Sequence, residues 1–462
     1  MTLRCLYALV TIGGGLSLLG LAGCGDAAPA GCAESAGCLA ISAPALPAGA
    51  LLDSLEVVAR TDSKLVRTQV TDRVLRPPLG LNVALPERAA GERLTLYLRA
   101  TASAQTGQPL GGSVDIPAAQ AGPHAVSLRA PCAQESCAAP SARLGAALAY
   151  DAASRQLVLF GGAAASGAPL SDTWAWDGVG WHQLTWPGSP GPAARTGHSL
   201  VYDQRGGRLV LFGGLGAGSP QQPLGDAWQL DTAKGWQRLS DTGAGGASSP
   251  EPRSQAAMAS TRDGVVLFGG LAATGTPLAD TWLLDGSGWR QTGSGSCAAT
   301  PASSPRCRRA ATLASDGMGG ALLLGGWLGE GSATPTFDDV VWGWDGQSWS
   351  QPAIYRPPVV LNRFAHAAAF AAFPQASPAL LVGFGEAQSG VLRLDSFLLD
   401  LHPGATAGQF APQLGAAPPA RREAALAYDE ERGEVLLFGG LGASGALGDT
   451  WRFEPAGHWS QR

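Results

Sequence analysis

Short apolar runs that end on glycine recur through the last two thirds of the chain. None of them alternates apolar with polar residues. A run without a period of two predicts a strand that is covered on both faces, as strands are when sheets stack on one another. The six runs read LVLFGG, LVLFGG, VVLFGG, ALLLGG, LLVGFG and VLLFGG, and they close at Gly162, Gly214, Gly270, Gly326, Gly385 and Gly440.

Each apolar run lies inside a longer repeat that begins with arginine. A strand of small residues follows the arginine, as in RTGHSLVYD, and the apolar run comes next. A long loop then leads to a strand with an acid before an aromatic residue, as in GDAW, and a short turn leads to a strand with tryptophan. The fifth repeat lacks that last tryptophan, so it is predicted to be degenerate. The six starts, spaced 52 to 58 residues apart, are Arg143, Arg195, Arg253, Arg308, Arg363 and Arg421.

These residues resemble the kelch family, whose blades read arginine, small-residue strand, glycine pair, aromatic third strand and tryptophan in the fourth. The resemblance covers residues 143–462 and implies an all-β fold, a six-bladed kelch-type β-propeller of the kind at the centre of galactose oxidase. In many kelch rings, one blade is completed by a strand from the other end of the chain. Here the first repeat starts with its own first strand and the last repeat ends with its own fourth strand. We therefore expect the last blade to close by side-chain packing alone or with a strand such as 124–130.

The chain before the propeller divides into four segments. Residues 1–23 carry Arg4 and then an apolar run, which predicts a signal peptide. Residues 51–130 show short strand-like runs separated by turns, which predict a small β-sandwich of immunoglobulin-like kind. Residues 24–50 and 131–142 are rich in Ala, Gly, Pro and Ser and predict a tether and a linker.

The signal peptide ends in LAGC, which resembles the bacterial lipobox. In that motif the peptidase cuts before the cysteine, here Cys24, and the thiol takes a diacylglycerol. The alternative is a membrane-spanning anchor, but the apolar run is at the short limit for one. We therefore expect a lipid-anchored protein of the bacterial cell envelope. Because Gly25 rather than aspartate follows the cysteine, the outer membrane is the favoured destination.

The cysteines and the net charge limit which bonds and ligands are expected. Six cysteines remain besides Cys5 and Cys24, and an even number in an exported chain predicts disulfides. Cys297 and Cys307 stand alone in one loop and are expected to pair. The net charge of −5 leaves no basic excess for nucleic acid, and no histidine lies beside a cysteine pair at zinc-ligand spacing, so neither metal nor cofactor is expected. The cysteines whose pairing stays open are Cys32, Cys38, Cys132 and Cys137.

Recognition is expected on the face of the ring that receives the long connections between blades, because long loops on a rigid scaffold commonly carry binding. The six repeat arginines fall on this face, and the kelch resemblance implies that such arginines line the channel mouth and bind acidic groups bidentately. The alternative is that each arginine pairs with an aspartate of its repeat and is structural. Trp186 and Trp327 do not occupy the positions at which the repeats share a tryptophan, and they are candidate ligand contacts. The aspartates in question include Asp172, Asp226, Asp280 and Asp449.

The sequence favours a non-catalytic binding module that recognises a protein segment or a glycan at the envelope. A structural or adhesive scaffold without a discrete ligand is the second hypothesis. An oxidase-type propeller enzyme is the third, but the copper site of galactose oxidase needs a Tyr–Cys crosslink and histidine ligands. His198 and His366 share one repeat position in opposite blades, which argues against a common metal.

Overall fold

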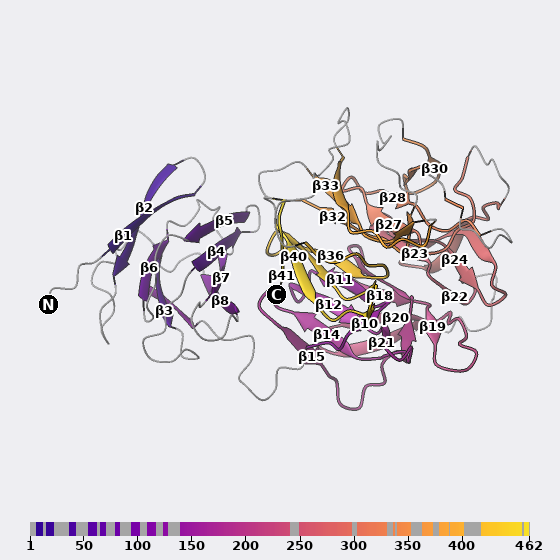
Figure 1. The fold of residues 1–462 in the computed structure, drawn as a ribbon, viewed down its shortest axis with the longest axis horizontal. Helices are drawn as coiled ribbons and strands as arrows, with labels where there is room; N and C mark the ends of the chain where they lie inside the picture. The colour runs from indigo at the N-terminus through magenta and orange to yellow at the C-terminus, as the bar shows by residue number, and fades with distance from the viewer. Residues whose placement is uncertain are drawn as a thin grey trace. The chain divides into compact units, whose positions relative to one another are not determined.

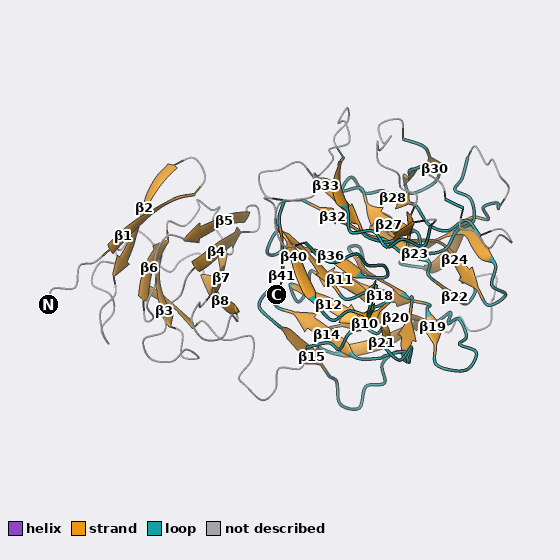
Figure 2. Cartoon of the chain, in the orientation of Figure 1, coloured by secondary structure: helices purple, strands orange, loops and turns teal. Residues whose placement is uncertain are grey.

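A computed structural model describes two compact units, which we treat separately: Met1–Ala139 with Asp177–Trp181, and Pro140–Trp176 with His182–Arg462. Every regular element of the described residues is a β-strand (Figure 2). No helix among those residues is long and apolar enough to cross a membrane. The described ranges are 6–12, 15–22, 37–42, 54–61, 65–70, 79–83, 94–101, 109–116, 123–127 and 139–461, the last with gaps at 241–248, 298–302, 330–335, 338–339, 353–362, 373–377, 388, 402–416 and 455–456.

The first unit contains a five-stranded and a four-stranded sheet, ordered β1-β2-β6-β3-β9 and β5-β4-β7-β8. The central strands β4 and β7 are buried, with Leu55, Leu94 and Leu96 fully inside. The strands β1 and β2 lie in the segment predicted as signal peptide, and the immunoglobulin-like sandwich and the signal peptide both stay predictions. The strands are β1 (Leu6–Ile12), β2 (Gly15–Ala22), β3 (Gly37–Ser42), β4 (Ser54–Thr61), β5 (Leu65–Val70), β6 (Leu79–Val83), β7 (Leu94–Thr101), β8 (Pro109–Ile116) and β9 (Pro123–Ser127).

The second unit is a ring of six antiparallel sheets (Figure 1). Blades one and two comprise β10 (Arg143–Leu144), β11 (Ala147–Asp151), β12 (Gln156–Phe160), β13 (Ala163–Ala164), β14 (Thr173–Trp176) and β15 (Trp181–Leu184), then β16 (Arg195–Thr196), β17 (Ser199–Asp203), β18 (Arg208–Phe212), β19 (Leu215–Gly216), β20 (Ala227–Asp231) and β21 (Gly235–Ser240). Blades three and four comprise β22 (Arg253–Ser254), β23 (Ala257–Thr261), β24 (Gly264–Ala272), β25 (Pro277–Asp285) and β26 (Gly288–Gly293), then β27 (Thr312–Ser315), β28 (Ala321–Leu324), β29 (Trp342–Trp344) and β30 (Trp349–Ser350).

Blades five and six complete the ring. They comprise β31 (Arg363–Phe364), β32 (Ala367–Ala371), β33 (Ala379–Gly383), β34 (Glu386–Ala387) and β35 (Ser396–Asp400), then β36 (Ala425–Asp429), β37 (Glu434–Phe438), β38 (Leu441–Gly442), β39 (Gly445–Ala446), β40 (Thr450–Phe453) and β41 (Trp459–Gln461). Blade five has three main strands within the described residues, β32-β33-β35, and its residues 402–416 lie outside them.

The apolar runs form the second strand of each blade and are buried on both faces, as predicted. Val210 and Phe212 of blade two pack with Val265 and Leu267 of blade three in one cluster. Phe212 also meets the fourth-strand Trp289 of the next blade edge-on, with ring centroids 5.3 Å apart. Stacking of adjacent blades therefore accounts for the continuous apolar pattern.

The glycine pair closing each run joins one blade to the next. Gly162 has a φ of 97° and donates its N–H to the carbonyl of Arg195, at 2.9 Å. A Cβ on the first glycine, Gly161, would lie 2.8 Å from that carbonyl oxygen, so the close approach requires glycine. Blade five reverses the order to Gly383 and Phe384, and Phe384 takes the left-handed φ of 63°.

The ring closes without a strand from the other terminus. All four main strands of blade six come from the end of the chain, and β36 lies beside β11 of blade one (Figure 1). Gly440 donates to the carbonyl of Arg143, and Arg143 donates to that of Leu447, both at 2.9 Å. The expectation of closure by side chains alone was therefore incomplete. Strand β9, which contains the whole described part of 124–130, pairs with β3 instead.

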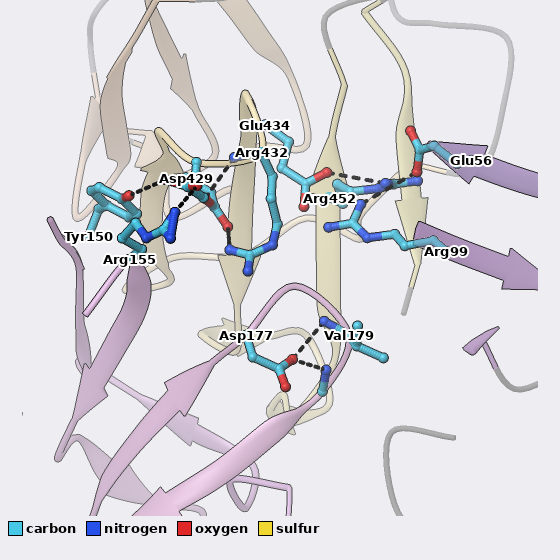
Figure 3. Close-up of polar contacts among 12 residues, drawn as sticks. Glu56, Arg99, Tyr150, Arg155, Asp177, Val179, Asp429, Arg432, Glu434 and Arg452 are labelled. Carbon is cyan, nitrogen blue, oxygen red and sulfur yellow. Dashed lines mark hydrogen bonds and ion pairs between the residues drawn. The ribbon is translucent and has the colours of Figure 1, made fainter. Parts of the chain in front are cut away.

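Side chains add to this closing seam (Figure 3). Arg155 of blade one and Glu431 of blade six form an ion pair of 2.9 Å. The hydroxyl of Tyr150 donates to the same carboxylate at 3.4 Å. Beside it, Arg432 pairs with Asp429 at 2.8 Å.

A second ring of hydrogen bonds encircles the channel mouth on the long-loop face. The third residue of each repeat has a φ between 51° and 62° and donates its N–H to the same position of a neighbouring blade, at 2.7 to 3.0 Å. Six such bonds close on themselves, so the mouth has a rigid inner rim. Its members are Gly145, Gly197, Gln255, Ala310, Ala365 and Glu423.

Candidate functional site

The repeat arginines are buried struts within their blades. The guanidinium of Arg143 donates from Nη1 and Nη2 to the carboxylate of Asp172, at 2.6 and 2.8 Å. Nη1 also donates to the carbonyl of Gly161, and Nε donates to that of Ser141. The side chains of all six arginines are between 0% and 2% exposed.

The other blades repeat this geometry. Carboxylate pairs join Arg195 to Asp226, Arg253 to Asp280, Arg363 to Asp395 and Arg421 to Asp449. Arg308 donates to the carbonyl of Gly325, and the acids at 338 and 339 lie outside the described residues. The geometry corresponds to the strut alternative rather than to an open anion-binding ring, because the N–H groups already point at partners in their own blade.

In four blades the acid of the strut also accepts a hydrogen bond from the third-strand tryptophan. Asp172 Oδ2 accepts a hydrogen bond from Trp174 Nε1 at 2.6 Å, and equivalent bonds occur at Trp228, Trp282 and Trp451. Burial raises the pKa of Asp172, but the hydrogen bonds from Arg143 and Trp174 outweigh it and leave the pKa below its usual value. The acid-x-tryptophan pattern is thus explained as one arginine–aspartate–tryptophan unit in each of blades one, two, three and six.

The two tryptophans outside the main phase lie in different surroundings. Trp186 donates from Nε1 to the carbonyl of Thr232 at 3.1 Å and packs against Gly235, so it joins a core cluster between blades one and two. Trp327 follows the glycine pair of blade four and lies at the channel mouth. Its Nε1 is buried and has no hydrogen-bond partner.

The channel mouth departs from the repeat on one side only. At the position after the glycine pair, four blades carry Ala163, Leu215, Leu271 and Leu441, whereas blades four and five carry Trp327 and Glu386. At the position after the repeat arginine, blades one to three carry Leu144, Thr196 and Ser254, whereas blades four to six carry Arg309, Phe364 and Arg422. The two positions face each other across a short ladder, as Arg309 faces Trp327.

These departures form one contiguous row, which we call the mouth arc. It comprises Gln255, Arg309, Trp327, Phe364, Glu386, Arg422 and Glu423. The guanidinium of Arg309 stacks over the Trp327 ring at 3.9 Å from its centroid and donates from Nη1 to Gln255 Oε1 at 3.1 Å. The Trp327 ring in turn contacts Phe364, with centroids 5.5 Å apart.

The other half of the arc is ionic. Arg422 of blade six pairs with Glu386 of blade five. Its Nε lies 3.6 Å from a carboxylate oxygen of Glu423, which belongs to the inner rim. Burial raises the pKa of Glu423, Arg422 and Arg309 oppose this, and Glu386 adds to it. Burial also lowers the pKa of Arg309.

Sequence reasoning missed the arc apart from Trp327. The signal was present, because aligning the six repeats at the arginine and at the glycine pair isolates these residues. The residues that all repeats share are the struts, whereas the residues that differ between repeats lie at the channel mouth. Departures from a repeat rule are expected at functional sites.

Two further expectations concern histidine and cysteine. His198 and His366 are buried, and burial together with Arg195 and Arg363, respectively, lowers the pKa of each to about 3. The described residues contain no group of three or more metal-ligating side chains. Cys24, Cys32, Cys132 and Cys137 lie outside the described residues, and Cys38 falls in β3, where no side chain is described.

Cys297 and Cys307 face each other, with Cα atoms 4.8 Å apart and the sulfurs joined in the structure. This separation suits a disulfide. Cys307 is buried directly before the strut Arg308. The bond would therefore tie the connection between blades three and four to the ring.

Comparison with known proteins fits this geometry. Residues 178–369 match the KLHDC2/KLHL20/DRC7 Kelch-repeats domain. An adagio-like protein of Oryza sativa subsp. japonica is 35% identical over 28% of this chain and 22% of its own length. A serine/threonine-protein phosphatase of Arabidopsis thaliana is 34% identical over 22% of this chain and 10% of its own length, and an F-box/kelch-repeat protein of that plant is 33% identical over 28% of each chain. The match thus spans less than a third of each relative.

Among solved structures, that of YjhT is similar at a TM-score of 0.49 and 14% identity, over 70% of this chain and 98% of that one. The six sheets, the closed ring and the repeated struts define a six-bladed β-propeller. Residues 178–369 of this ring match a kelch-repeat family model.

Proposed function

We propose that this chain is a binding module that recognises a protein segment at the mouth arc. The observation that carries the proposal is the asymmetry of the mouth: six blades share one framework, yet aromatic and charged groups gather on blades four to six only. A rigid rim holds these groups, and placement of varied side chains on a rigid scaffold is how repeat proteins commonly achieve recognition. A glycan is the alternative ligand, since the partly exposed Trp327 offers aromatic surface.

The test swaps arc residues for those that other blades carry. Arg309→Ser with Trp327→Leu converts blade four to the residues of blade three, which has Ser254 and Leu271. The matched control is Thr196→Ser with Leu215→Ala on blade two. We expect the arc variant of the full chain to lose retained proteins in affinity capture while the control keeps them. Equal retention by both variants would refute the arc as the recognition site.

We also propose that the module is anchored to the bacterial envelope through lipid on Cys24. The lipobox-like LAGC and the apolar run before it support this. Cys24→Ser should move the protein from the membrane fraction to the soluble fraction. Identical fractionation of the two forms would show that another segment holds it.

A further inference from the structure

Arg309 is a half-buried cation without an acidic partner among the described residues. One face of its guanidinium is covered by the Trp327 ring at 3.9 Å. Its side-chain hydrogen bond goes from Nη1 to the neutral amide of Gln255. The edge that carries Nε and Nη2 is therefore left to accept an anion, and a guanidinium edge binds a carboxylate in two parallel hydrogen bonds.

Glu423 is the complementary case, a carboxylate whose ion pair with Arg422 is long. Its side chain is 25% exposed, and Arg422 Nε lies 3.6 Å away, beyond normal hydrogen-bond length. Arg422 instead gives its Nη1 to Glu386. The carboxylate lies over Gly145, with Oε2 3.5 Å from where a Cβ would stand.

The two groups lie on either side of blade five. Arg309 belongs to blade four and Glu423 to blade six, and blade five places Phe364 at the repeat position that corresponds to Arg309. They do not form an ion pair with each other, although each affects the other electrostatically. A charge that is partly removed from water and has only a neutral or a distant partner is unfavourable, and a ligand group of opposite charge offsets that cost.

We propose that the mouth arc selects peptide segments in which an acidic and a basic residue occur close together. The acidic group binds the edge of Arg309, the basic group binds Glu423, and the intervening backbone crosses blade five. A purely acidic segment is attracted by Arg309 but repelled by Glu423. A purely basic segment is attracted by Glu423 but repelled by Arg309. This inference rests on the proposed function and names the chemistry of its ligand.

The test measures binding of capped synthetic peptides to the purified full chain by calorimetry at low salt. The panel holds one glutamate and one lysine in both orders, separated by one to three alanines, with matched peptides in which glutamine replaces either charge. We expect at least one mixed-charge peptide to bind about tenfold or more tightly than both of its single-charge counterparts. A single-charge peptide that binds equally well, or no binding by any mixed-charge peptide, would overturn the proposal.

Two isosteric variants assign the ends. Arg309→Gln should abolish the preference for glutamate over glutamine, and Glu423→Gln should abolish the preference for lysine over glutamine, each leaving the other preference in place. Thermal unfolding checks that both variants fold, and the peptide comparison on the unmodified chain stands without them. If the peptides fail while the arc variant of the preceding section still loses its retained proteins, only the ligand chemistry is wrong.

Discussion

At the residue scale, the fourth-strand tryptophans show how one side chain links neighbouring blades. Trp236 donates from Nε1 to the hydroxyl of Thr173 in the preceding blade, at 3.0 Å, and Trp349 donates to Thr281 at 2.8 Å. The corresponding residue of blade two is Ala227, which has no hydroxyl, and Nε1 of Trp289 is buried without a partner. A buried polar group that is unsatisfied costs stability.

Replacing Ala227 by serine should therefore stabilise the protein. The added hydroxyl lies where Thr173 and Thr281 carry theirs, and one new buried hydrogen bond contributes about 1 kcal/mol to the free energy of unfolding. The reverse change, Thr173→Ala, should destabilise by a similar amount because it strands Trp236. Denaturant unfolding of the full chain measures both, and a fall in stability with Ala227→Ser would show that the site cannot hold a hydroxyl.

The buried histidines predict how stability depends on pH. The pKa of His198 is about 3 in the folded chain, against an ordinary value of 6.5. As pH falls below 6.5 the unfolded chain takes up a proton that the folded chain does not, so stability declines by up to about 1.4 kcal/mol per pH unit for this residue. His198→Ala should reduce that slope, and alanine is native at this position in four blades, as at Ala146 and Ala256.

The comparison is the change in unfolding free energy between pH 7 and pH 4.5 in both proteins. The absolute stability of the variant also reflects lost packing on Phe160, whose ring lies 5.3 Å from that of His198, so the slope is the informative quantity. Equal slopes would mean that the folded chain protonates His198 readily.

At the scale of the blade, the arginine struts are the main polar framework. Arg195→Ala should lower the free energy of unfolding by about 3 kcal/mol, because it leaves the partly buried Asp226 without its partner. Lysine should rescue only part of this, since it cannot make the two parallel bonds. The control is Arg205→Ala at an exposed turn, expected within about 0.5 kcal/mol of the parent. Loss of ligand binding without loss of stability in Arg195→Ala would contradict the strut assignment.

The connection between blades three and four carries the predicted disulfide. The bond between Cys297 and Cys307 closes a short loop, and the chain-entropy estimate gives somewhat under about 3 kcal/mol. Mass mapping of the oxidised protein should return a peptide that links the two cysteines. A free thiol at either position would refute the pairing.

Much of the blade could be predicted from sequence because its rules are local and repeated six times. The two-sided burial of the apolar runs and the order of the four strands follow from letters such as LVLFGG. The sequence offered Asp172 as the partner of Arg143 but could not choose between this pairing and a ligand, because Asp172 lies 29 residues further along and only the folded blade brings the two within 2.6 Å. Trp186 was misleading for the same reason, since its contact with Thr232 spans two blades.

At the scale of the whole molecule, the number of blades was predictable and the closure of the ring was not. Closure rests on backbone hydrogen bonds between Arg143, Leu447 and Gly440, and main-chain groups leave little trace in a sequence. The mouth arc likewise needs the ring, because it brings together Arg309 and Glu423 from repeats that are not consecutive. Six equal frameworks with one distinct sector favour recognition at the arc.

Site-specific photo-crosslinking tests whether ligands bind at the arc. Benzoylphenylalanine replaces Trp327 in one protein and Leu215, the same repeat position in blade two, in the other, and both are irradiated in cells that produce the full chain. The account predicts a discrete covalent product at position 327 and little or none at position 215. Equal products at the two positions, or none at 327 with the label incorporated and the protein folded, would contradict it.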